Sequence, residues 1–278
     1  ISESAWEEMT CLFAPSLSED DLEQQCLQWF AEQGWDVLHG PDIAPDGDNP
    51  LRASFHDVFL RPVMLEQLQT INPHLPVSVL EEVILRIAHA YSPDLVVSNK
   101  AFHHLLLNGV PVEYKHEDKV IHDNALLMDF NHPDNNRFMV VNQVAIQGIK
   151  QVRRPDVIGY INGLPVAVIE LKSPIDANAD IWAAFNQLQT YKNELSDLFI
   201  CNEALVVSDG QNARVGSLTA DEERFLPWRT VANENDKPQF DWQLKTVVQG
   251  FFNRELLLDY IRYFVLFEND SKRLIKKI

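Results

Sequence analysis

The order of apolar and polar residues divides this chain into helical and strand-like stretches. Ser18 followed by Asp21 resembles a capping box, and the apolar residues behind it recur at helical spacing as far as Gly34. Three further helices are expected to begin at Pro76, at Ser98 and near Asp180. Between them the period shortens towards two, which indicates strands. The expected strands are Trp35–Leu38, Val110–Tyr114, Ala125–Phe130, Phe138–Ile149, Ala204–Ser208 and Arg214–Leu218.

The most informative stretch runs from Arg153 to Lys172. Two short apolar runs rich in Val and Ile flank an Asn-Gly pair, which predicts a β-hairpin. Both faces of the hairpin are apolar, as expected for strands covered by helices on each side. Asp156, Glu170 and Lys172 interrupt this pattern at the end away from the turn. Buried charges are costly unless they are paired, hydrogen-bonded or bound to metal, so these three require an explanation.

The hairpin register decides whether the two carboxylates can cooperate. Regular pairing around a two-residue turn at Asn162-Gly163 would set Asp156 opposite Ile169 and leave Glu170 on the other face. A three-residue turn with Gly163 in the left-handed conformation, or a one-residue bulge, returns both acids to one face. We therefore predict one of these two irregularities.

Composition and charge limit the possible classes of protein. The 278 residues are 46% apolar, with no apolar run near the ~20 residues of a membrane helix and no signal peptide, so we expect a soluble, cytoplasmic protein without membrane contact. A formal charge of −18 argues against broad attraction to nucleic acid, and any DNA contact should be local. The three cysteines have neither metal-ligand nor disulfide spacing. We expect an α/β fold, a mixed central sheet flanked by helices, with two helices at roughly 242–252 and 255–267 as a C-terminal helical appendage.

Two carboxylates and a lysine at one strand end are typical of a metal-dependent hydrolytic site. Mg²⁺ prefers oxygen ligands, and Asp156, Glu170 and the carbonyl of Leu171 would supply them. The metal would polarise a phosphoryl oxygen and lower the pKa of a bound water, while Lys172 orients that water or stabilises developing charge. The competing interpretation is a solvated strand end with an incidental salt bridge. The position of all three charges at one end of a buried hairpin favours the metal site.

These residues resemble the PD-(D/E)xK nucleases, and within them the N-terminal nuclease region of the motor (R) subunit of type I restriction enzymes. The resemblance rests on Arg153-Arg154-Pro155-Asp156, on Asn162-Gly163-Leu164-Pro165 and on Ile169-Glu170-Leu171-Lys172. Gln187 and Tyr191 look like the Gln-x-x-x-Tyr motif of that family. They lie four residues apart, hence on one helix face, where they could contact DNA or brace the site. Weaker similarity extends through Leu126–Phe130, Val141–Gln143 and Ser208–Gly210, so that together the match covers most of residues 18–230.

The resemblance implies a restriction-endonuclease-like fold and Mg²⁺-dependent cleavage of double-stranded DNA, with Asp156, Glu170 and Lys172 catalytic. It implies a nuclease domain over residues 1–235 and a connector over 236–278 towards an ATP-dependent translocase. The chain contains no phosphate-binding loop of the Gly-x-x-x-x-Gly-Lys-Ser/Thr type, so ATP would act in a part that is absent here. The expected partners are the specificity and methyltransferase subunits of a restriction complex. The missing initiator Met agrees with a fragment of a longer protein.

Other residues and functions remain open. Arg153 and Arg154 either contact phosphate or neutralise nearby acids. For Glu23 we favour a solvated helix surface over a metal ligand, and for His103-His104 packing or surface roles over a zinc site. Ser208-Asp209-Gly210 is better explained as a turn than as catalytic chemistry. Another nuclease of the same fold, acting in repair or junction resolution, or a docking module that only holds DNA or a partner, are the alternative functions.

Overall fold

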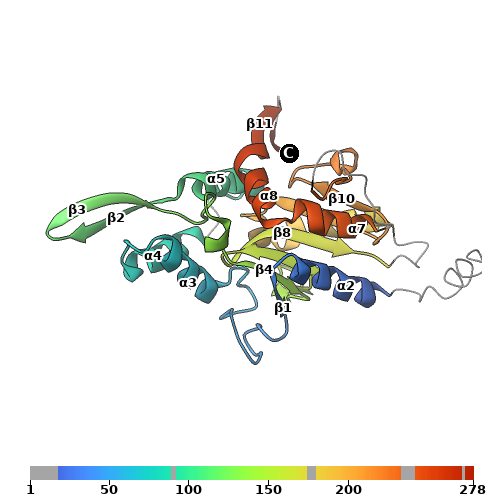
Figure 1. Cartoon of the computed structure of the whole chain (residues 1–278), viewed down its shortest axis with the longest axis horizontal. Coiled ribbons are helices and arrows are strands. Elements are labelled where there is room, and N and C mark those ends of the chain that lie inside the picture. Colours follow the sequence, from blue (N-terminus) through green and yellow to red (C-terminus); the bar gives the residue numbers. More distant parts are fainter. Residues whose placement is uncertain (1–17, 89–91, 174–179, 233–241, 271–272) are drawn as a thin grey trace, which may run out of the picture.

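In the computed structural model, one long hairpin projects from a body of strands and helices (Figure 1). It describes residues 18–88, 92–173, 180–232, 242–270 and 273–278. The expected irregular lead-in over 1–17, Tyr91 at the end of the second helix and the proposed boundary around Pro238 lie outside these residues. None of the helices within the described ranges is long and apolar enough to cross a membrane.

The centre of the body is a six-stranded mixed sheet, as expected. Its strand order is β1-β4-β7-β8-β9-β10, with β1 parallel to β4, β8 parallel to β9, and the other neighbours antiparallel. These strands are β1 (Asp36–His39), β4 (Phe138–Asn142), β7 (Val157–Ile161), β8 (Leu164–Leu171), β9 (Ala204–Ser208) and β10 (Ala213–Gly216). Every residue of β4, β7, β8 and β9 is buried, so the centre of the sheet is covered on both faces.

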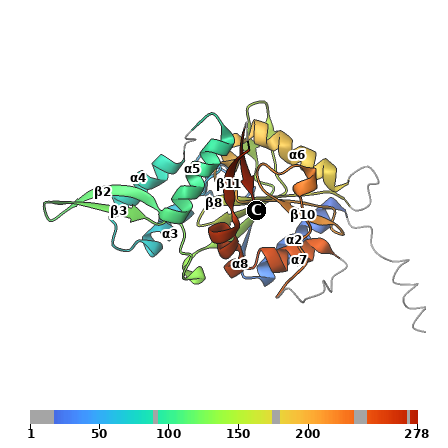
Figure 2. The same ribbon diagram turned by 90° about the horizontal axis from the view of Figure 1, so that it is seen from above.

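Helices cover the two faces of the sheet. The α2 helix (Glu19–Glu32) packs against β4 and β8, and α6 (Ile181–Glu194) packs against β8 and β9. Seen from above, α2 and α6 lie on opposite sides of the strands (Figure 2). The predicted capping box begins α2, because the Ser18 hydroxyl accepts from the Asp21 amide while the Asp21 carboxylate accepts from the Ser18 amide.

The remaining elements lie around this sheet. The projecting hairpin is formed by β2 and β3, next to α3, α4 and α5 (Figures 1 and 2). The bounds are α3 (Arg61–Ile71), α4 (Val77–Ile87), α5 (Leu95–Asn108), β2 (Val110–His116), β3 (Lys119–Ala125), β5 (Ile146–Gln147), β6 (Val152–Arg153) and the short turns η1 (Pro133–Asn135), η2 (Ser196–Phe199) and η3 (Glu222–Arg224).

The hairpin of β7 and β8 combines a tight turn with a bulge. Asn162 and Gly163 have φ values of 55° and 80°, and Ile161 pairs with Leu164, as in a two-residue turn of the primed type. Further along, Tyr160 pairs with Pro165 but Gly159 pairs with Ala167, so Val166 is one extra residue. The predicted irregularity is therefore confirmed as a bulge, and the register beyond it is shifted by one residue.

Two sequence expectations upstream of the hairpin are wrong. Residues 126–130 form no strand, because Leu126 donates its amide to Asn72 and Leu127 gives its carbonyl to Asn162 instead of to a neighbouring strand. The strand expected over 138–149 breaks after Asn142, since Gln143 has a left-handed φ of 51° and turns the chain. No element was expected over the residues that form α3.

The C-terminal appendage is helical, but it ends in a hairpin. Four short helical segments are followed by two strands, where a helix to residue 267 and a basic tail were expected. The segments are α7 (Gln243–Thr246), the π-helical turn η4 (Val247–Phe251), α8 (Arg254–Asp259), the π-helical turn η5 (Tyr260–Phe264), β11 (Leu266–Asp270) and β12 (Arg273–Lys277). Buried side chains of the four helical segments join the same hydrophobic core as α2 and the sheet.

A buried ion pair anchors this last hairpin. Lys276 in β12 donates from Nζ to Glu203 at 2.7 Å, and His103 of α5 lies 3.1 Å from the same carboxylate. Asn99 and the carbonyl of Asn202 also accept from Lys276. Burial alone would raise the pKa of Glu203, but Lys276 and His103 lower it below its usual value. This cluster of charges is thus internally compensated.

The turn predicts a specific cost for adding a side chain at Gly163. A Cβ there would lie 2.7 Å from the Leu60 carbonyl oxygen and 2.7 Å from Met64 Cγ, whereas at Gly34, with φ 79°, the nearest atom would be in the Arg254 side chain at 3.8 Å. The left-handed backbone costs about 1–2 kcal/mol in both Ala variants. Overlap should add about 1–3 kcal/mol in Gly163→Ala only. Urea unfolding of Gly163→Ala and Gly34→Ala measures this difference, and equal losses would contradict it.

Candidate functional site

The bulge brings the two predicted carboxylates to the same face of the sheet. Beyond Val166 the register pairs Val157 with Ile169, and its next step sets Asp156 opposite Glu170. Directly opposed residues of an antiparallel pair project from the same face. The acids that a regular hairpin would separate therefore lie side by side at the end of the sheet.

Backbone and lysine contacts hold this group together. Asp156 accepts at Oδ2 from the Leu171 amide at 2.7 Å. The Nζ of Lys172 donates to the Leu171 carbonyl at 2.8 Å and to Glu170 Oε1 at 3.3 Å. Glu170 is fully buried, Asp156 is 7% exposed, and the Lys172 side chain is 13% exposed. The structure thus gathers all the residues predicted for catalysis.

Burial makes the charged forms of both acids unfavourable. Desolvation raises the pKa of Glu170 well above its usual value, the charge of Asp156 raises it further, and Lys172 opposes both. Desolvation also raises the pKa of Asp156 to about 6, although the Leu171 amide and Lys172 act in the other direction. One lysine is therefore insufficient compensation for two buried carboxylates.

The donor set fits a hard divalent cation. Glu170 Oε2 is buried and has no hydrogen-bond partner among the described residues, which leaves a charged acceptor oxygen open. With Asp156 and the Leu171 carbonyl, the available donors are all oxygen, as Mg²⁺ prefers. In the part of the chain that the structure describes, no three His, Cys, Asp or Glu side chains gather into a metal-binding group, so the fit depends on two carboxylates and a carbonyl.

Two further acids approach the site from α2. Glu19 lies 3.9 Å from the Lys172 Nζ, and Glu23, one turn later, is 6% exposed. Glu23 accepts from the side-chain amide of Asn142 at 2.7 Å and from the side-chain amide of Gln143 at 2.6 Å. The expectation of a solvated Glu23 is wrong, because the end of β4 packs over this helix face. The spacing of Glu19 and Glu23 was the sequence signal for a shared face.

The Gln-x-x-x-Tyr pair lies beside the acids as a brace. Gln187 donates from Nε2 to the Tyr191 hydroxyl at 2.6 Å, and that hydroxyl donates to the Arg154 carbonyl at 3.4 Å. Tyr191 is buried, and burial followed by the nearby charge of Glu170 raises its pKa. These bonds fix the backbone two residues before Asp156.

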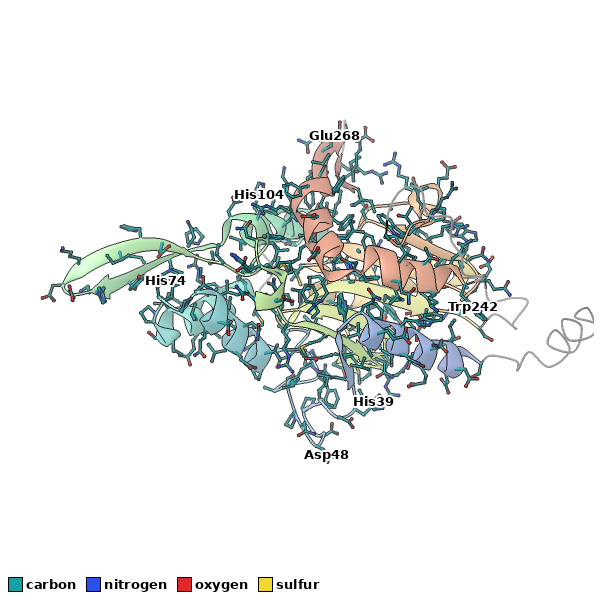
Figure 3. The ribbon with its side chains drawn as sticks, viewed as in Figure 1. His39, Asp48, His74, His104, Trp242 and Glu268 are labelled. Atoms are coloured by element: carbon teal, nitrogen blue, oxygen red, sulfur yellow. The ribbon has the colours of Figure 1, made fainter. Side chains whose placement is uncertain are left out.

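The remaining candidates are distributed more widely. Arg153 pairs with Glu194 at 2.7 Å and not with the site acids, while the Arg154 side chain is exposed. His103 belongs to the buried Glu203 cluster, and His104 lies on α5 (Figure 3).

The expected turn after β9 is confirmed. Asp209 accepts from the Asn212 amide at 2.6 Å, and Ser208 donates from its hydroxyl to the Asn212 carbonyl at 2.7 Å. These contacts close the loop between β9 and β10 and account for Ser208-Asp209-Gly210 without catalytic chemistry.

Comparisons with known proteins match most of the chain. Residues 16–224 match the family described as "Type I restriction enzyme R protein N terminus". The type I restriction enzyme HindI endonuclease subunit of Haemophilus influenzae is 43% identical over 266 residues, which cover 94% of this chain and 25% of that protein. The putative MjaIXP endonuclease subunit of Methanocaldococcus jannaschii is 28% identical, covering 94% and 27%. The EcoprrI endonuclease subunit of Escherichia coli is 28% identical, covering 94% and 78%. The chain thus spans about a quarter of the first two relatives.

The raised pKa of Asp156 predicts a pH-dependent loss of stability in the metal-free protein. An acid whose pKa is higher in the folded state stabilises the fold below its unfolded pKa of 3.8, and this contribution is lost as pH rises through about 6. Relative to Asp156→Asn, the wild type should lose about 2 kcal/mol between pH 4 and pH 7. Urea unfolding of both proteins in EDTA measures the difference, in which acids that do not interact with Asp156 cancel. A difference that does not vary with pH would contradict the prediction.

Proposed function

Because the chain belongs to the family of type I restriction enzyme R protein N termini, we propose that it is the DNA-cleaving part of a restriction complex. The proposed reaction is Mg²⁺-dependent endonucleolytic hydrolysis of a phosphodiester bond in double-stranded DNA. The observation that carries the proposal is the buried, facing pair Asp156 and Glu170, whose charges Lys172 compensates only in part.

The proposed ligands are Asp156, Glu170 and the Leu171 carbonyl. Burial is unfavourable for both carboxylates as anions, so a bound cation would offset that cost. The open Oε2 of Glu170 supports this assignment, because this buried carboxyl oxygen has no hydrogen-bond partner among the residues that the structure describes. Mg²⁺ also keeps several waters, and such a site needs few protein oxygens.

Each residue then has a distinct role. Mg²⁺, when bound, polarises a phosphoryl oxygen and lowers the pKa of a coordinated water. Lys172 is held between Glu170 and Glu19, at 3.3 Å and 3.9 Å, and presents its ammonium to the attacking water or to the charge that develops on phosphate. The Leu171 amide fixes one oxygen of Asp156.

The proposed DNA contacts are local. The hydrogen bond between Gln187 and Tyr191 supports the backbone just before β7. The Gln187 side chain is only partly buried, so it can reach the backbone of DNA. Arg154 is exposed beside this brace and is a candidate for a phosphate contact, whereas Arg153 is engaged by Glu194. With a chain charge of −18, most of the attraction to DNA must come from elsewhere in the assembly.

We therefore assign delivery of DNA to partner subunits. The relatives are named endonuclease subunits of type I restriction enzymes, and this chain spans only part of them. In the proposal, specificity and methyltransferase subunits position the complex, and ATP is used by a translocase outside this chain. The domain division at residues 235 and 236 remains a prediction.

Loss of a catalytic side chain should separate cleavage from ATP use. Asp156→Ala and Lys172→Ala, made in the full-length subunit and assembled with its partners, should lower DNA cleavage by about 10²- to 10⁴-fold with Mg²⁺ and ATP, because each removes a group that acts on the reacting phosphate. ATP hydrolysis should persist. Lys119→Ala, at the tip of the projecting hairpin, is the control and should leave both unchanged. Undiminished cleavage in both site variants would refute the proposal.

Titration with Mn²⁺ tests the metal assignment independently of cleavage. The chain should bind one Mn²⁺ saturably at neutral pH, measured by electron paramagnetic resonance, and Asp156→Ala or Glu170→Ala should abolish binding because each removes a ligand. Glu194→Ala, which alters a carboxylate paired with Arg153, serves as control. A well-folded wild type that binds no Mn²⁺ with or without duplex DNA would favour the docking module. The negative net charge of the chain also supports that alternative. Mg²⁺-dependent cutting by this chain alone, without ATP or partners, would favour a repair or junction-resolving nuclease.

A further inference from the structure

The end of β4 forms a sharp corner over the acids. Asn142 is the last residue of the strand, and Gln143 follows with a φ of 51°, one of four non-glycine residues with positive φ in the described chain. The backbone amide of Gln143 donates to the Asp156 carbonyl at 3.0 Å. A left-handed conformation is unfavourable for Gln, so the surrounding contacts must maintain it.

Both side-chain amides of this corner engage one carboxylate. Asn142 Nδ2 donates to Glu23 Oε1 at 2.7 Å, and Gln143 Nε2 donates to Glu23 Oε2 at 2.6 Å. These donors are neutral, so they orient the buried carboxylate without cancelling its charge. Among the residues that the structure describes, no Lys or Arg pairs with Glu23.

The corner is also fixed from its outer side. Since Asn142 presents its NH₂ group to Glu23, its Oδ1 accepts from His39, whose Nδ1 lies 2.8 Å away and must carry the proton. His39 is the last residue of β1 and lies in the lower part of the view in Figure 3. The next residue, Gly40, donates its amide to the Asn142 carbonyl, and a Cβ on Gly40 would lie 2.5 Å from that oxygen. Close approach of the two strand ends therefore requires glycine at this position.

Gln143 joins the two sides of the site. Its backbone amide holds the chain at Asp156, and its side chain holds Glu23 of α2. On the same helix face, one turn earlier, Glu19 reaches Lys172. The face of α2 that bears Glu19 and Glu23 therefore lies against the end of β7 and β8.

We infer that Asn142 and Gln143 are positioning residues that orient the Glu23 carboxylate towards the water shell of the cation held by Asp156 and Glu170. This inference rests on the proposed function. A carboxylate has about four acceptor positions, and the two amides use two of them, which leaves two for waters bound to the cation. Such outer contacts act on metal affinity through the waters, and Glu23 need not touch the metal.

A purely structural role predicts a different result. If the amides served only to satisfy a buried Glu23, their removal would change the free energy of unfolding but leave the intrinsic Mn²⁺ affinity of the folded chain unaltered. Metal affinity, measured on samples shown to be folded, distinguishes the two roles.

The decisive variant is Gln143→Asn. Asn tolerates the left-handed conformation better than Gln, so the corner is retained, but its side chain is shorter and withdraws the amide from Glu23. Gln147→Asn, the same substitution in β5, is the matched control, because the Gln147 side chain donates to the neighbouring Gly148 carbonyl and, among the described residues, to nothing at the site. Glu23→Gln removes the charge at nearly constant volume.

Mn²⁺ binding to the chain, with and without a short DNA duplex, is measured by electron paramagnetic resonance at neutral pH. Gln143→Asn and Glu23→Gln should each weaken binding about 10- to 100-fold, and Gln147→Asn should not. The double variant should be no weaker than Glu23→Gln alone, because Gln143 acts through Glu23. Circular dichroism and the urea midpoint establish that each variant is folded.

The outcomes separate this inference from the proposed function. Wild-type affinity in Gln143→Asn or Glu23→Gln, while Asp156→Ala abolishes binding, would overturn the positioning role and leave the metal site intact. Losses that add in the double variant would also overturn it. No Mn²⁺ binding by the wild type under either condition would overturn both.

Discussion

The site depends on two carboxylates being held together at a buried strand end. Glu170 is fully buried and Asp156 nearly so, and the charge of Asp156 raises the cost of ionising Glu170. Lys172 offsets part of this cost, and one oxygen of Glu170 has no partner among the described residues. A fold retains such an arrangement only where the rest of the structure stabilises it, and here the hairpin lies in the middle of the sheet between α2 and α6.

A second buried group of charges in the same fold shows the contrast. Glu203, just before β9, meets Lys276, which also reaches Asn99 and the Asn202 carbonyl. Every charge there has a counter-charge or a hydrogen bond, and the result is to fasten the C-terminal hairpin to the body. At Asp156 and Glu170 compensation is incomplete. Complete pairing is consistent with a structural role, while the deficit of positive charge at the strand end is what a cation would supply.

Local irregularities of the backbone create the site geometry. The primed turn at Asn162 and Gly163 fixes the hairpin, and the extra residue Val166 changes its register in time to place the acids together. The left-handed Gln143 ends β4 where its side chain can reach α2. Each of these departs from regular strand geometry, and all lie in the hairpin that carries the acids or at the neighbouring end of β4.

The sequence by itself determined the candidate site residues and much of the architecture. Hydrophobic periodicity gave α2, α6 and the central strands, because helical and strand spacings are local properties of the chain. The Asn-Gly pair with Asp156 and Glu170 at fixed offsets even required an irregularity, since side chains alternate strictly along a strand. The sequence left the choice between a longer turn and a bulge open.

Only the tertiary structure decided that choice and the surroundings of the site. Glu23 reads as a surface residue on its own helix, and it becomes buried because the end of β4, more than a hundred residues later, covers it. The strand expected after Ala125 fails because distant side chains of Asn72 and Asn162 take its backbone groups. Part of the basic tail forms β12, where Lys276 forms a buried ion pair with Glu203. Such long-range contacts depend on which surfaces the fold brings together. The local spacing of apolar and polar residues therefore does not predict them.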